Sequence, residues 1–327
     1  MAVRIKQYSE CSKECWDVFV NQSYHGWIWH LSDFIEVKLY WENHSNLSFA
    51  VVDEGDEIVA IFPLFLIGAK KFRVLNTPTF DNIGGWVIDP QIKDKQPVLN
   101  ALKEECQKII TKNNCSLINI NFATASLLHD KDPLFFSGIE GQSAYIGVLD
   151  LTKEISVLWS NIRKGHKSEI NKGEKKGLSF RLATTQDLGL YYEMHEATCK
   201  RSDIQPHPKP YFEKIFRYFI PSGKSIVGLA YEGRNPIAVA NYAVYKGVST
   251  YWTGASFDTA LKNGANHFLH WKLIQELKTN NVQKIDMGPL ISPNATQKIQ
   301  GIGKFKTGFG GEILPIYKYS QTERFVW

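Results

Sequence analysis

Three strand-forming segments follow one another in the second half of the chain, with only turn residues between them. They span residues 225–231, 236–245 and 248–253. The intervening pairs Arg234-Asn235 and Lys246-Gly247 are residue types that favour tight turns. Strands joined in this way pair with their neighbours in sequence, so this part of the chain predicts an antiparallel meander.

Helical patterns surround this meander, and a similar order of elements occurs in the first half. The second half predicts helices at residues 156–176, 187–200, 210–219 and 266–279, and further strands at 178–183, 284–287 and 312–319. The first half predicts helices at residues 12–21, 31–41 and 96–113, and strands at 3–7, 47–53, 57–67, 72–76, 86–88, 117–122 and 144–151. This order indicates a mixed α/β fold of the α+β class.

The length of 327 residues fits two domains better than one or three. We expect the first domain at residues 1–152 and the second at residues 153–327. No segment rich in Gly, Pro or Ser separates the two halves, so we expect the domains to pack together.

The composition is that of a folded soluble protein, and it does not indicate a dedicated nucleic-acid binder. Hydrophobic residues make up 43% of the chain and charged residues 22%, which is ordinary for a globular protein. The net charge of +5 is mild for a nucleic-acid-binding domain, although it suits substrates that carry phosphates.

The cysteines and the N-terminus predict a cytoplasmic protein without a metal site. The five cysteines are odd in number, and Cys11 and Cys15 have no second pair at zinc-binding spacing. Isolated thiols are typical of a reducing compartment. The N-terminus lacks the apolar core of a signal peptide, and the longest apolar run, residues 58–67, contains Pro63 and is shorter than the ~20 residues of a membrane span.

Four segments of the second half, taken in order, resemble the FemABX family and its CoA-using relatives. They are a basic helix ending in glycine (LWSNIRKGHKSEINKGEKKG, 158–177), a strand end (TYWTGAS, 250–256), a Trp-bearing helix and strand ending in Asp286-Met287-Gly288 (270–288), and Phe-Lys followed by Phe-Gly (GKFKTGFGG, 303–311). The resemblance covers about half of the chain. In the first half it rests on length and strand order.

The resemblance implies two tandem GNAT-like domains and an acyltransferase that needs no metal or bound cofactor. The co-substrate is an aminoacyl-tRNA or an acyl-CoA. The acceptor is an amine on a nucleotide-linked or lipid-linked sugar or peptide precursor of the cell envelope, and a lipid-linked acceptor implies peripheral contact with a membrane. Two alternatives stay open: an acyl-CoA-dependent N-acetyltransferase of surface-polysaccharide biosynthesis, and a non-catalytic binding module on the same fold.

Three residues are candidates for the chemistry of acyl transfer, which requires deprotonation of the amine and stabilisation of the carbonyl oxygen. Lys306, in the Phe-Lys motif, is expected to stabilise the oxyanion. Tyr251 is expected to orient the amine or relay its proton, and Asp286 to bind or act as base. Each also has a structural interpretation: a surface lysine, a half-buried strand aromatic and a turn-forming carboxylate. The glycines at 301, 303, 308, 310 and 311 indicate a loop around Lys306.

Further candidates concern substrate binding. Phe305 belongs to the Phe-Lys motif, and Trp252 is expected on the strand face opposite Tyr251. In the family an Arg-x-x-x-Tyr pair grips the precursor's phosphates. Here His207 stands in the arginine position before Tyr211, and histidine lacks the bidentate fork, so Arg201 and Lys209 are possible substitutes. The basic residues of 156–176 either contact phosphate or form a solvated helix face; they are Arg163, Lys164, Lys167, Lys172, Lys175 and Lys176.

The segment from Lys262 to Asn266 is the candidate for a CoA pyrophosphate. Lys262 and Gly264 precede a predicted helix, whose N-terminal amides would meet the phosphates. The segment matches the usual Gly-rich pattern only in part. Other catalytic motifs are absent from the sequence: no Gly-x-Ser-x-Gly elbow, no second histidine after His195-Glu196, and no Ser or Thr after Gly303-Lys304 to complete a P-loop.

Overall fold

In the computed structural model of the chain, the meander has the extent that the turn residues predict. Its strands are β11 (Ser225–Glu232), β12 (Asn235–Tyr245) and β13 (Val248–Ser256), paired antiparallel in sequence order. Lys246 and Gly247 both have positive φ, at 47° and 74°, as the tightest two-residue hairpin turn requires. A register shift between Asn241 and Tyr242 adds one extra residue to β13.

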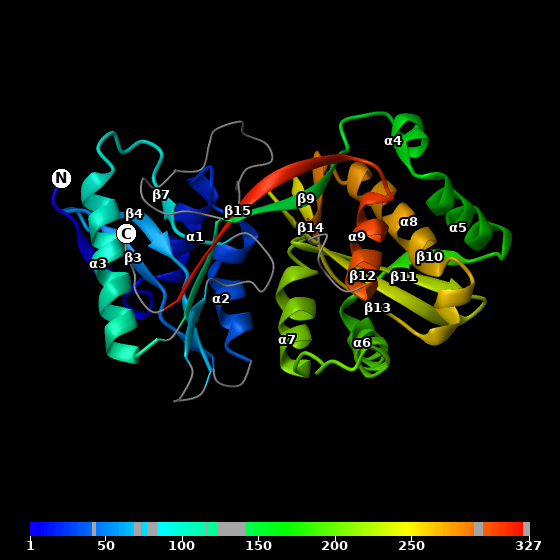
Figure 1. Cartoon of the computed structure of the whole chain (residues 1–327), viewed down its shortest axis with the longest axis horizontal. Coiled ribbons are helices and arrows are strands. Elements are labelled where there is room, and N and C mark those ends of the chain that lie inside the picture. Colours follow the sequence, from blue (N-terminus) through cyan, green and yellow to red (C-terminus); the bar gives the residue numbers. More distant parts are fainter. Residues whose placement is uncertain are drawn as a thin grey trace. The chain divides into compact units, whose positions relative to one another are not determined.

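The structure describes residues 1–40, 44–68, 73–76, 84–115, 117–122, 142–290 and 297–322. The chain divides into two units, which are described separately (Figure 1). The first comprises Met1–Ala144 and Pro315–Trp327, and the second Tyr145–Leu314. Compared with the division expected from the sequence, residues 145–152 lie in the second unit, and most of the last strand, β15 (Glu312–Thr322), is counted with the first.

In the second unit the meander is extended on both sides. β10 (Ser179–Leu182) pairs with β11, while β14 (Lys284–Leu290) pairs parallel with β13 and antiparallel with β9 (Gln142–Asp150). The pairing of β13 with β14 ends at Thr250 and Asp286, although β13 continues for six more residues to Ser256. The two strands therefore separate beyond this point and leave an opening at the centre of the sheet.

Helices cover both faces of this sheet (Figure 1). α5 (Lys164–Lys175) and α8 (Ala265–Thr279) lie on one face, and α6 (Leu188–Ser202) and α7 (Lys209–Lys214) on the other. α7 continues into a π-helical segment (η4, Ile215–Phe219). The remaining helices of this unit are α4 (Ile155–Asn161), α9 (Gln297–Thr307) and the 3₁₀ turns η3 (Thr185–Asp187) and η5 (Asp258–Lys262).

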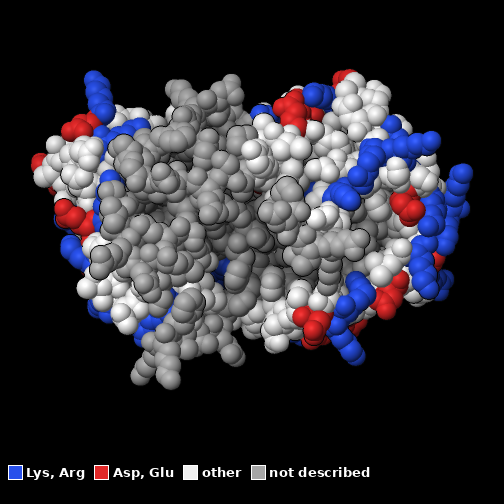
Figure 2. Space-filling model, in the orientation of Figure 1, with Lys and Arg blue, Asp and Glu red and all other residues white. Residues whose placement is uncertain are grey.

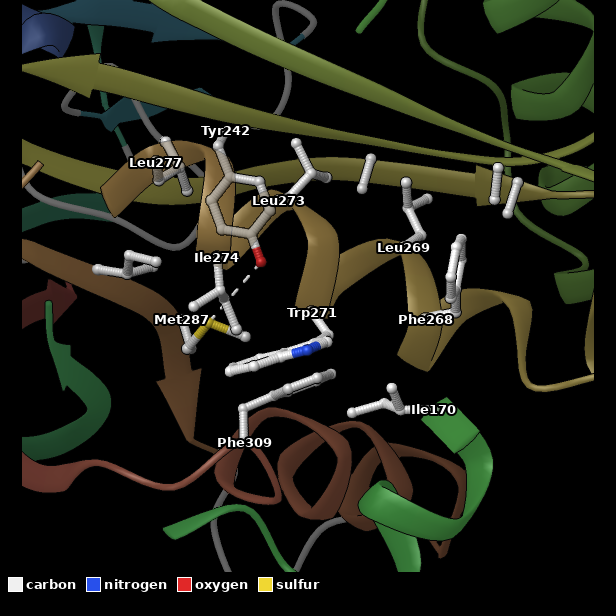
Figure 3. Packing of buried hydrophobic residues seen from close by; sticks show 14 of the residues in the cluster. Ile170, Tyr242, Phe268, Leu269, Trp271, Leu273, Ile274, Leu277, Met287 and Phe309 are labelled. Carbon is white, nitrogen blue, oxygen red and sulfur yellow. Dashed lines mark hydrogen bonds between the residues drawn. The ribbon is translucent and has the colours of Figure 1, made fainter. Parts of the chain in front are cut away.

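The core of the second unit lies between α8 and the sheet. Figure 3 shows Leu269, Leu273 and Leu277 of α8 packed toward the strands, with Tyr242 of β12 and Met287 of β14 beside them. The Tyr242 hydroxyl donates a hydrogen bond to the Met287 sulfur, 3.8 Å away. α8 is apolar around most of its circumference because α5 covers its other side.

Two predictions for the second unit are wrong. The single helix expected at residues 156–176 is two helices, α4 and α5, because Ile162 and Arg163 have extended backbone. Ile162 is buried in the core, and the Arg163 N–H donates to the Gly308 carbonyl 2.9 Å away. The loop expected around Lys306 is largely the helix α9, within which Gly301 and Gly303 lie. Each interior glycine costs a helix about 1 kcal/mol, so tertiary contacts must compensate.

The described residues of the first unit form strands in two sheets. One has the order β1-β3-β4-β7, and the other runs β15-β8-β6-β5-β2. The strands are β1 (Arg4–Gln7), β2 (His44–Asn46), β3 (Phe49–Val52), β4 (Ile58–Phe62), β5 (Phe65–Ile67), β6 (Val74–Asn76), β7 (Val87–Ile88) and β8 (Leu117–Phe122). The helices are α1 (Lys13–Gln22), α2 (Ser32–Lys38), α3 (Gln96–Asn113) and the 3₁₀ turns η1 (Tyr8–Glu10) and η2 (Ile28–His30).

The strand expected at residues 57–67 is two strands in different sheets. Pro63 separates β4 from β5, since it has no N–H to continue the ladder. The Leu64 N–H that follows donates instead to the Ser48 hydroxyl, at 2.9 Å. In the described ranges of the chain, we find no helix with the length and apolarity needed to cross a bilayer.

Candidate functional site

Asp286 lies on β14 at the point where β13 and β14 separate. Its side chain is fully buried, and Oδ1 accepts a hydrogen bond from the Gly288 N–H at 2.6 Å. Within the part of the chain that the structure describes, Oδ2 has no hydrogen-bond partner. Burial raises the pKa of the carboxyl to about 6, against the opposing effects of the Gly288 N–H and the Lys306 ammonium. Asp286 thus has a turn-forming role and also an oxygen available for proton transfer.

Lys306 belongs to the last turn of α9 and is directed toward the same strand end. Its Nζ lies 2.8 Å from the position that a Cβ would occupy on Gly288, so a larger residue there would displace the ammonium. Gly288 also has a positive φ of 83°, at an irregularity in the pairing of β14 with β9. The structure therefore brings Asp286 and Lys306 together, although twenty residues separate them in sequence.

A pocket of about 240 Å³ opens next to the end of β13, where this strand no longer pairs with β14. Its lining includes Tyr251, Phe305, Arg201 and His270, and the others are Thr198, Val239, Gly254, Ala255, Ser256, Leu261 and Asn266. Three of the residues predicted from sequence, Tyr251, Phe305 and Arg201, thus meet in one cavity. Burial raises the pKa of Tyr251 to about 12, so its hydroxyl is protonated at neutral pH and can donate a hydrogen bond to a ligand.

Three histidines that the sequence analysis did not select surround Phe305. Its ring centroid lies 5.7 Å from that of His166, 5.0 Å from His267 and 5.1 Å from His270. Burial lowers the pKa of all three, to about 4 for His267 and about 3 for His270, so they are neutral near pH 7. His267 and His270 are three residues apart on one face of α8, a spacing that could have drawn attention to them.

His270 has a further polar contact inside the core. Its Nδ1 is 2.6 Å from the hydroxyl of Tyr242, a buried residue of the meander. Across the described residues, no three His, Cys, Asp or Glu side chains are gathered so that they could hold a metal ion. The histidines therefore form an aromatic and hydrogen-bonding wall around Phe305.

Tyr251 and Trp252 lie on opposite faces of the sheet, as predicted. Tyr251 packs against Tyr242 and His270 on the α8 side. The indole Nε1 of Trp252 donates to the Tyr211 hydroxyl, 2.8 Å away, on the α7 side. The two neighbouring aromatics therefore belong to separate environments.

Tyr211 and His207 form part of a second aromatic cluster. Their ring centroids are 5.5 Å apart, and only 3% of Tyr211 is exposed. The backbone N–H of His207 donates to Nε2 of His195 at 2.9 Å, and burial lowers the pKa of His195 to about 4. The structure brings Tyr211, His207 and Trp252 together, but none of them lines the pocket beside Tyr251.

Arg201 lines the pocket while its guanidinium is hydrogen-bonded to neighbouring protein groups. It donates to the Ser256 carbonyl at 3.1 Å and to Oδ1 of Asp258 at 2.7 Å. These bonds hold the end of β13 against α6. The Arg201 side chain therefore shapes the pocket wall at the end of the strand.

Gly264 and Lys262 precede α8, as the sequence indicated. A Cβ on Gly264 would overlap the backbone carbonyl oxygen of Glu169 in α5, and the φ of Gly264 is +75°. The Ala265 N–H donates to the Asn263 side chain at 3.3 Å. This helix start is thus packed closely against α5, while Lys262 is exposed.

The basic residues predicted at 156–176 gather where α5 lies in the second unit (Figure 2). Some take part in local ion pairs: Lys172 lies 3.4 Å from Glu169, and Glu174 pairs with Lys272 of α8 at 3.2 Å. Lys164, Lys175 and Lys176 are exposed. The α5 surface therefore combines paired and solvent-exposed cations.

Comparison with known proteins agrees with this architecture. Residues 160–298 match the family model described as an acetyltransferase (GNAT) domain. The chain is similar to the crystal structure of FemX, with a TM-score of 0.69 and 14% identity over 98% of this chain and 97% of that one. It is also similar to a tandem GNAT protein from the clavulanic acid biosynthesis pathway, with a TM-score of 0.58 and 9% identity over 98% of each chain.

A third similar structure is the C-terminal domain of a putative lysylphosphatidylglycerol synthetase from Agrobacterium fabrum. Its TM-score is 0.57, with 12% identity over 95% of this chain and 92% of that one. No curated protein sequence matches the chain. At such identities the structural similarities establish the fold, which is that of tandem GNAT-like domains, while the family match bears on activity. The chain therefore contains a region, residues 160–298, that matches a GNAT acetyltransferase domain, and it is an acyltransferase.

Proposed function

We propose that the protein transfers an aminoacyl group from a charged tRNA to an amine of a cell-envelope precursor, at the opening between β13 and β14. The observation that carries this proposal is the proximity of the buried carboxyl of Asp286 to the ammonium of Lys306 at the end of β14. A base and a cation at one strand end are the two groups that amide formation needs.

The roles of the two residues follow from their charges. With a pKa of about 6, Asp286 is ionised at pH 7 and accepts a proton from the attacking amine. The amine nitrogen bonds to the donor carbonyl carbon, and the Lys306 ammonium stabilises the negative oxygen that results. The ester bond of the donor then breaks, and the leaving hydroxyl takes up the proton. Tyr251, Phe305 and Arg201 line the cavity that receives the transferred group.

The start of α8 favours aminoacyl-tRNA over acyl-CoA as the donor. A pyrophosphate bound at a helix N-terminus requires free amide groups and no competing negative charge. Here the Glu169 carbonyl oxygen lies against Gly264, and a carboxylate oxygen of Glu169 is 3.3 Å from the Cβ position of that glycine. The exposed lysines of α5 suit the phosphates of a nucleic acid.

The acceptor is proposed from the sequence resemblance to the FemABX family. A nucleotide-linked or lipid-linked muropeptide with a free amine fits that resemblance, and a lipid-linked form would bring the protein into peripheral contact with a membrane. His207, which stands in the position of the family's arginine, lies in the aromatic cluster with Tyr211, so we propose that phosphate contacts of the acceptor come from other residues. Acyl-CoA remains the second candidate donor, because the matched family model is described as an acetyltransferase.

Radiolabelled aminoacyl-tRNA and radiolabelled acetyl-CoA, each incubated with a nucleotide-linked muropeptide that carries a free amine, distinguish the donors. We expect label transfer from aminoacyl-tRNA and at least about a tenfold loss of kcat in Lys306→Ala with unchanged Tm. Lys108→Ala, which removes an exposed lysine of α3, is the control and should keep its activity. Transfer from acetyl-CoA alone would support the second donor. If the wild type consumes neither donor, the non-catalytic binding module is favoured instead.

A further inference from the structure

The last turn of α9, which carries Phe305 and Lys306, is held by two side chains from the start of α5. The Arg163 guanidinium donates to the Lys304 carbonyl at 3.0 Å. The ring Nε2 of His166 lies 2.9 Å from the Phe305 carbonyl oxygen. These contacts join residues about 140 positions apart in sequence. The sequence analysis named Arg163 only as a possible phosphate contact and did not select His166.

Both acceptors are backbone carbonyls of the last turn of α9, and the Phe305 carbonyl also accepts the Gly308 N–H at 3.2 Å. The last four carbonyl groups of a helix lack an N–H donor from the following turn. A cation near this end is also favourable because the helix dipole is negative there. Arg163 and His166 thus bind the two backbone groups on the N-terminal side of the Lys306 side chain, which restricts how the last turn can rotate.

The hydrogen bonds define the protonation of His166. The Arg163 guanidinium lies 3.2 Å from Nδ1 of His166 and can only donate, so Nδ1 is the acceptor. The ring proton is therefore on Nε2, which donates to the Phe305 carbonyl. Burial lowers the pKa of His166, which agrees with this neutral form. Arg163, His166 and Phe305 form one continuous chain of donors and acceptors.

Gly308 allows the His166 ring to reach this position. A Cβ on Gly308 would overlap the ring atoms of His166, so only glycine fits here without moving the ring. The Gly308 carbonyl also accepts the backbone N–H of Arg163 at 2.9 Å. Lys304 and Phe305 before Lys306, and Gly308 after it, therefore each contact Arg163 or His166 at the start of α5.

We propose that Arg163 and His166 are positioning residues that hold the last turn of α9 so that the Lys306 ammonium lies beside Gly288 and Asp286. This inference rests on the proposed function of Lys306. Neither residue touches the reacting atoms in this role. They affect the reaction indirectly, because they set the position of Lys306 and of the Phe305 ring in the pocket wall.

Variants at His166 separate positioning from general structural support. His166→Phe keeps a ring of similar shape but removes the donor, whereas His166→Gln keeps an N–H group near the position of Nε2. We expect His166→Phe to lower kcat by about 10- to 100-fold with KM for both substrates within about twofold. His166→Gln should recover most of kcat. Equal losses in both variants together with a lower Tm would overturn the positioning role.

Arg163→Met provides a second variant with a matched control. Arg181→Met also removes an arginine that donates to a backbone carbonyl and to a nearby side chain. Arg181 lies on β10, an edge strand of the sheet. We expect kcat to fall at least about tenfold in Arg163→Met and to stay unchanged in Arg181→Met. If both arginine variants retain wild-type kcat while Lys306→Ala is inactive, the positioning role is wrong and the proposed function stands.

A readout that is independent of turnover tests the position of Lys306 directly. The Lys306 ammonium lowers the pKa of Asp286, so displacing α9 should raise that pKa above its wild-type value of about 6. The pKa can be measured from the ¹³C chemical shift of the labelled carboxyl. A higher pKa in His166→Phe and Arg163→Met supports the proposal even if Lys306→Ala retains activity and the proposed function fails. An unchanged pKa in both variants contradicts it.

Discussion

The indole Nε1 of Trp252 lies 2.8 Å from the hydroxyl oxygen of Tyr211, and this hydrogen bond joins β13 to α7. Trp252 is the extra residue that the register shift adds to β13, and its ring lies on the α7 side while Tyr251 faces α8. Phe219 packs against the same indole, with ring centroids 5.7 Å apart. The hydrogen bond and the ring contact therefore hold α7 and its π-helical continuation against β13.

Replacing Tyr211 with phenylalanine should lower stability rather than substrate affinity. The change removes the acceptor of the partly buried Trp252 indole N–H, which costs about 1 kcal/mol of unfolding free energy. Because the hydroxyl is already bonded within the protein, we expect KM for the acceptor to change less than about twofold. Urea unfolding and steady-state kinetics measure the two effects. Tyr218→Phe, at a more exposed position, is the control for loss of a hydroxyl. A large rise in KM for Tyr211→Phe would instead place this tyrosine at the acceptor.

The buried carboxyl of Asp286 should make stability depend on pH in an unusual direction. Its pKa in the folded protein, about 6, is higher than the ordinary value of 3.8 expected on unfolding. The folded state therefore binds the proton more tightly, and the stability from this group is present at low pH and lost as the pH rises from about 4 to about 6. The difference is on the order of 2–3 kcal/mol. Urea unfolding of the wild type and of Asp286→Asn at pH 4.5 and 7.5 measures the pH-dependent stability that Asp286 contributes. Equal pH dependence of the two proteins would contradict the expectation.

The same ionisation should appear in the kinetics. If Asp286 accepts the proton of the amine, kcat/KM rises with pH through about 6 and levels off above it. In Asp286→Asn we expect kcat to be at least about 100-fold lower and this inflection to be absent. The pH profile of kcat/KM under saturating donor is the measurement. An inflection that persists in Asp286→Asn would assign it to another group.

Gly254→Ala should reduce activity with little effect on folding. A Cβ at this position would overlap the hydroxyl of Tyr251, the mobile end of a side chain, so the Tyr251 ring must shift within the pocket. We expect kcat/KM to fall about tenfold and Tm to change by only a few degrees. The combined variant Gly254→Ala with Tyr251→Phe should recover part of this loss, since the overlapping oxygen is then absent. No recovery would mean that Tyr251 is not the residue displaced.

Gly264→Ala, in contrast, should be strongly destabilising. Its positive φ and the overlap of a Cβ with the Glu169 backbone together cost roughly 2–5 kcal/mol. Gly233→Ala is the matched control, because that glycine also has positive φ but open space around it. We expect Gly233→Ala to lower the free energy of unfolding by only about 1 kcal/mol, as measured by urea unfolding. Similar losses at the two positions would show that contact with α5 contributes little.

The short-range features of the chain were predictable from its sequence. Turn residues such as Lys246-Gly247 define β11, β12 and β13 to within a few residues, and the alternation of side chains along β13 places Tyr251 and Trp252 on opposite faces. The helix at Gln96–Asn113 follows from its apolar periodicity alone. In each case the determining interactions lie within a few residues along the chain, where propensity and periodicity act.

Only the tertiary structure decided the features that depend on distant contacts. Local propensity favours a loop at the glycines around Lys306. In the structure this segment is a helical turn, and its carbonyls accept hydrogen bonds from the side chains of Arg163 and His166. The helix expected at residues 156–176 is interrupted at Ile162, whose side chain is buried in a core that distant segments complete. The raised pKa of Asp286 likewise comes from complete burial between strands. Hydrogen bonding and desolvation across long sequence separations produce these features, so no local pattern of residues encodes them.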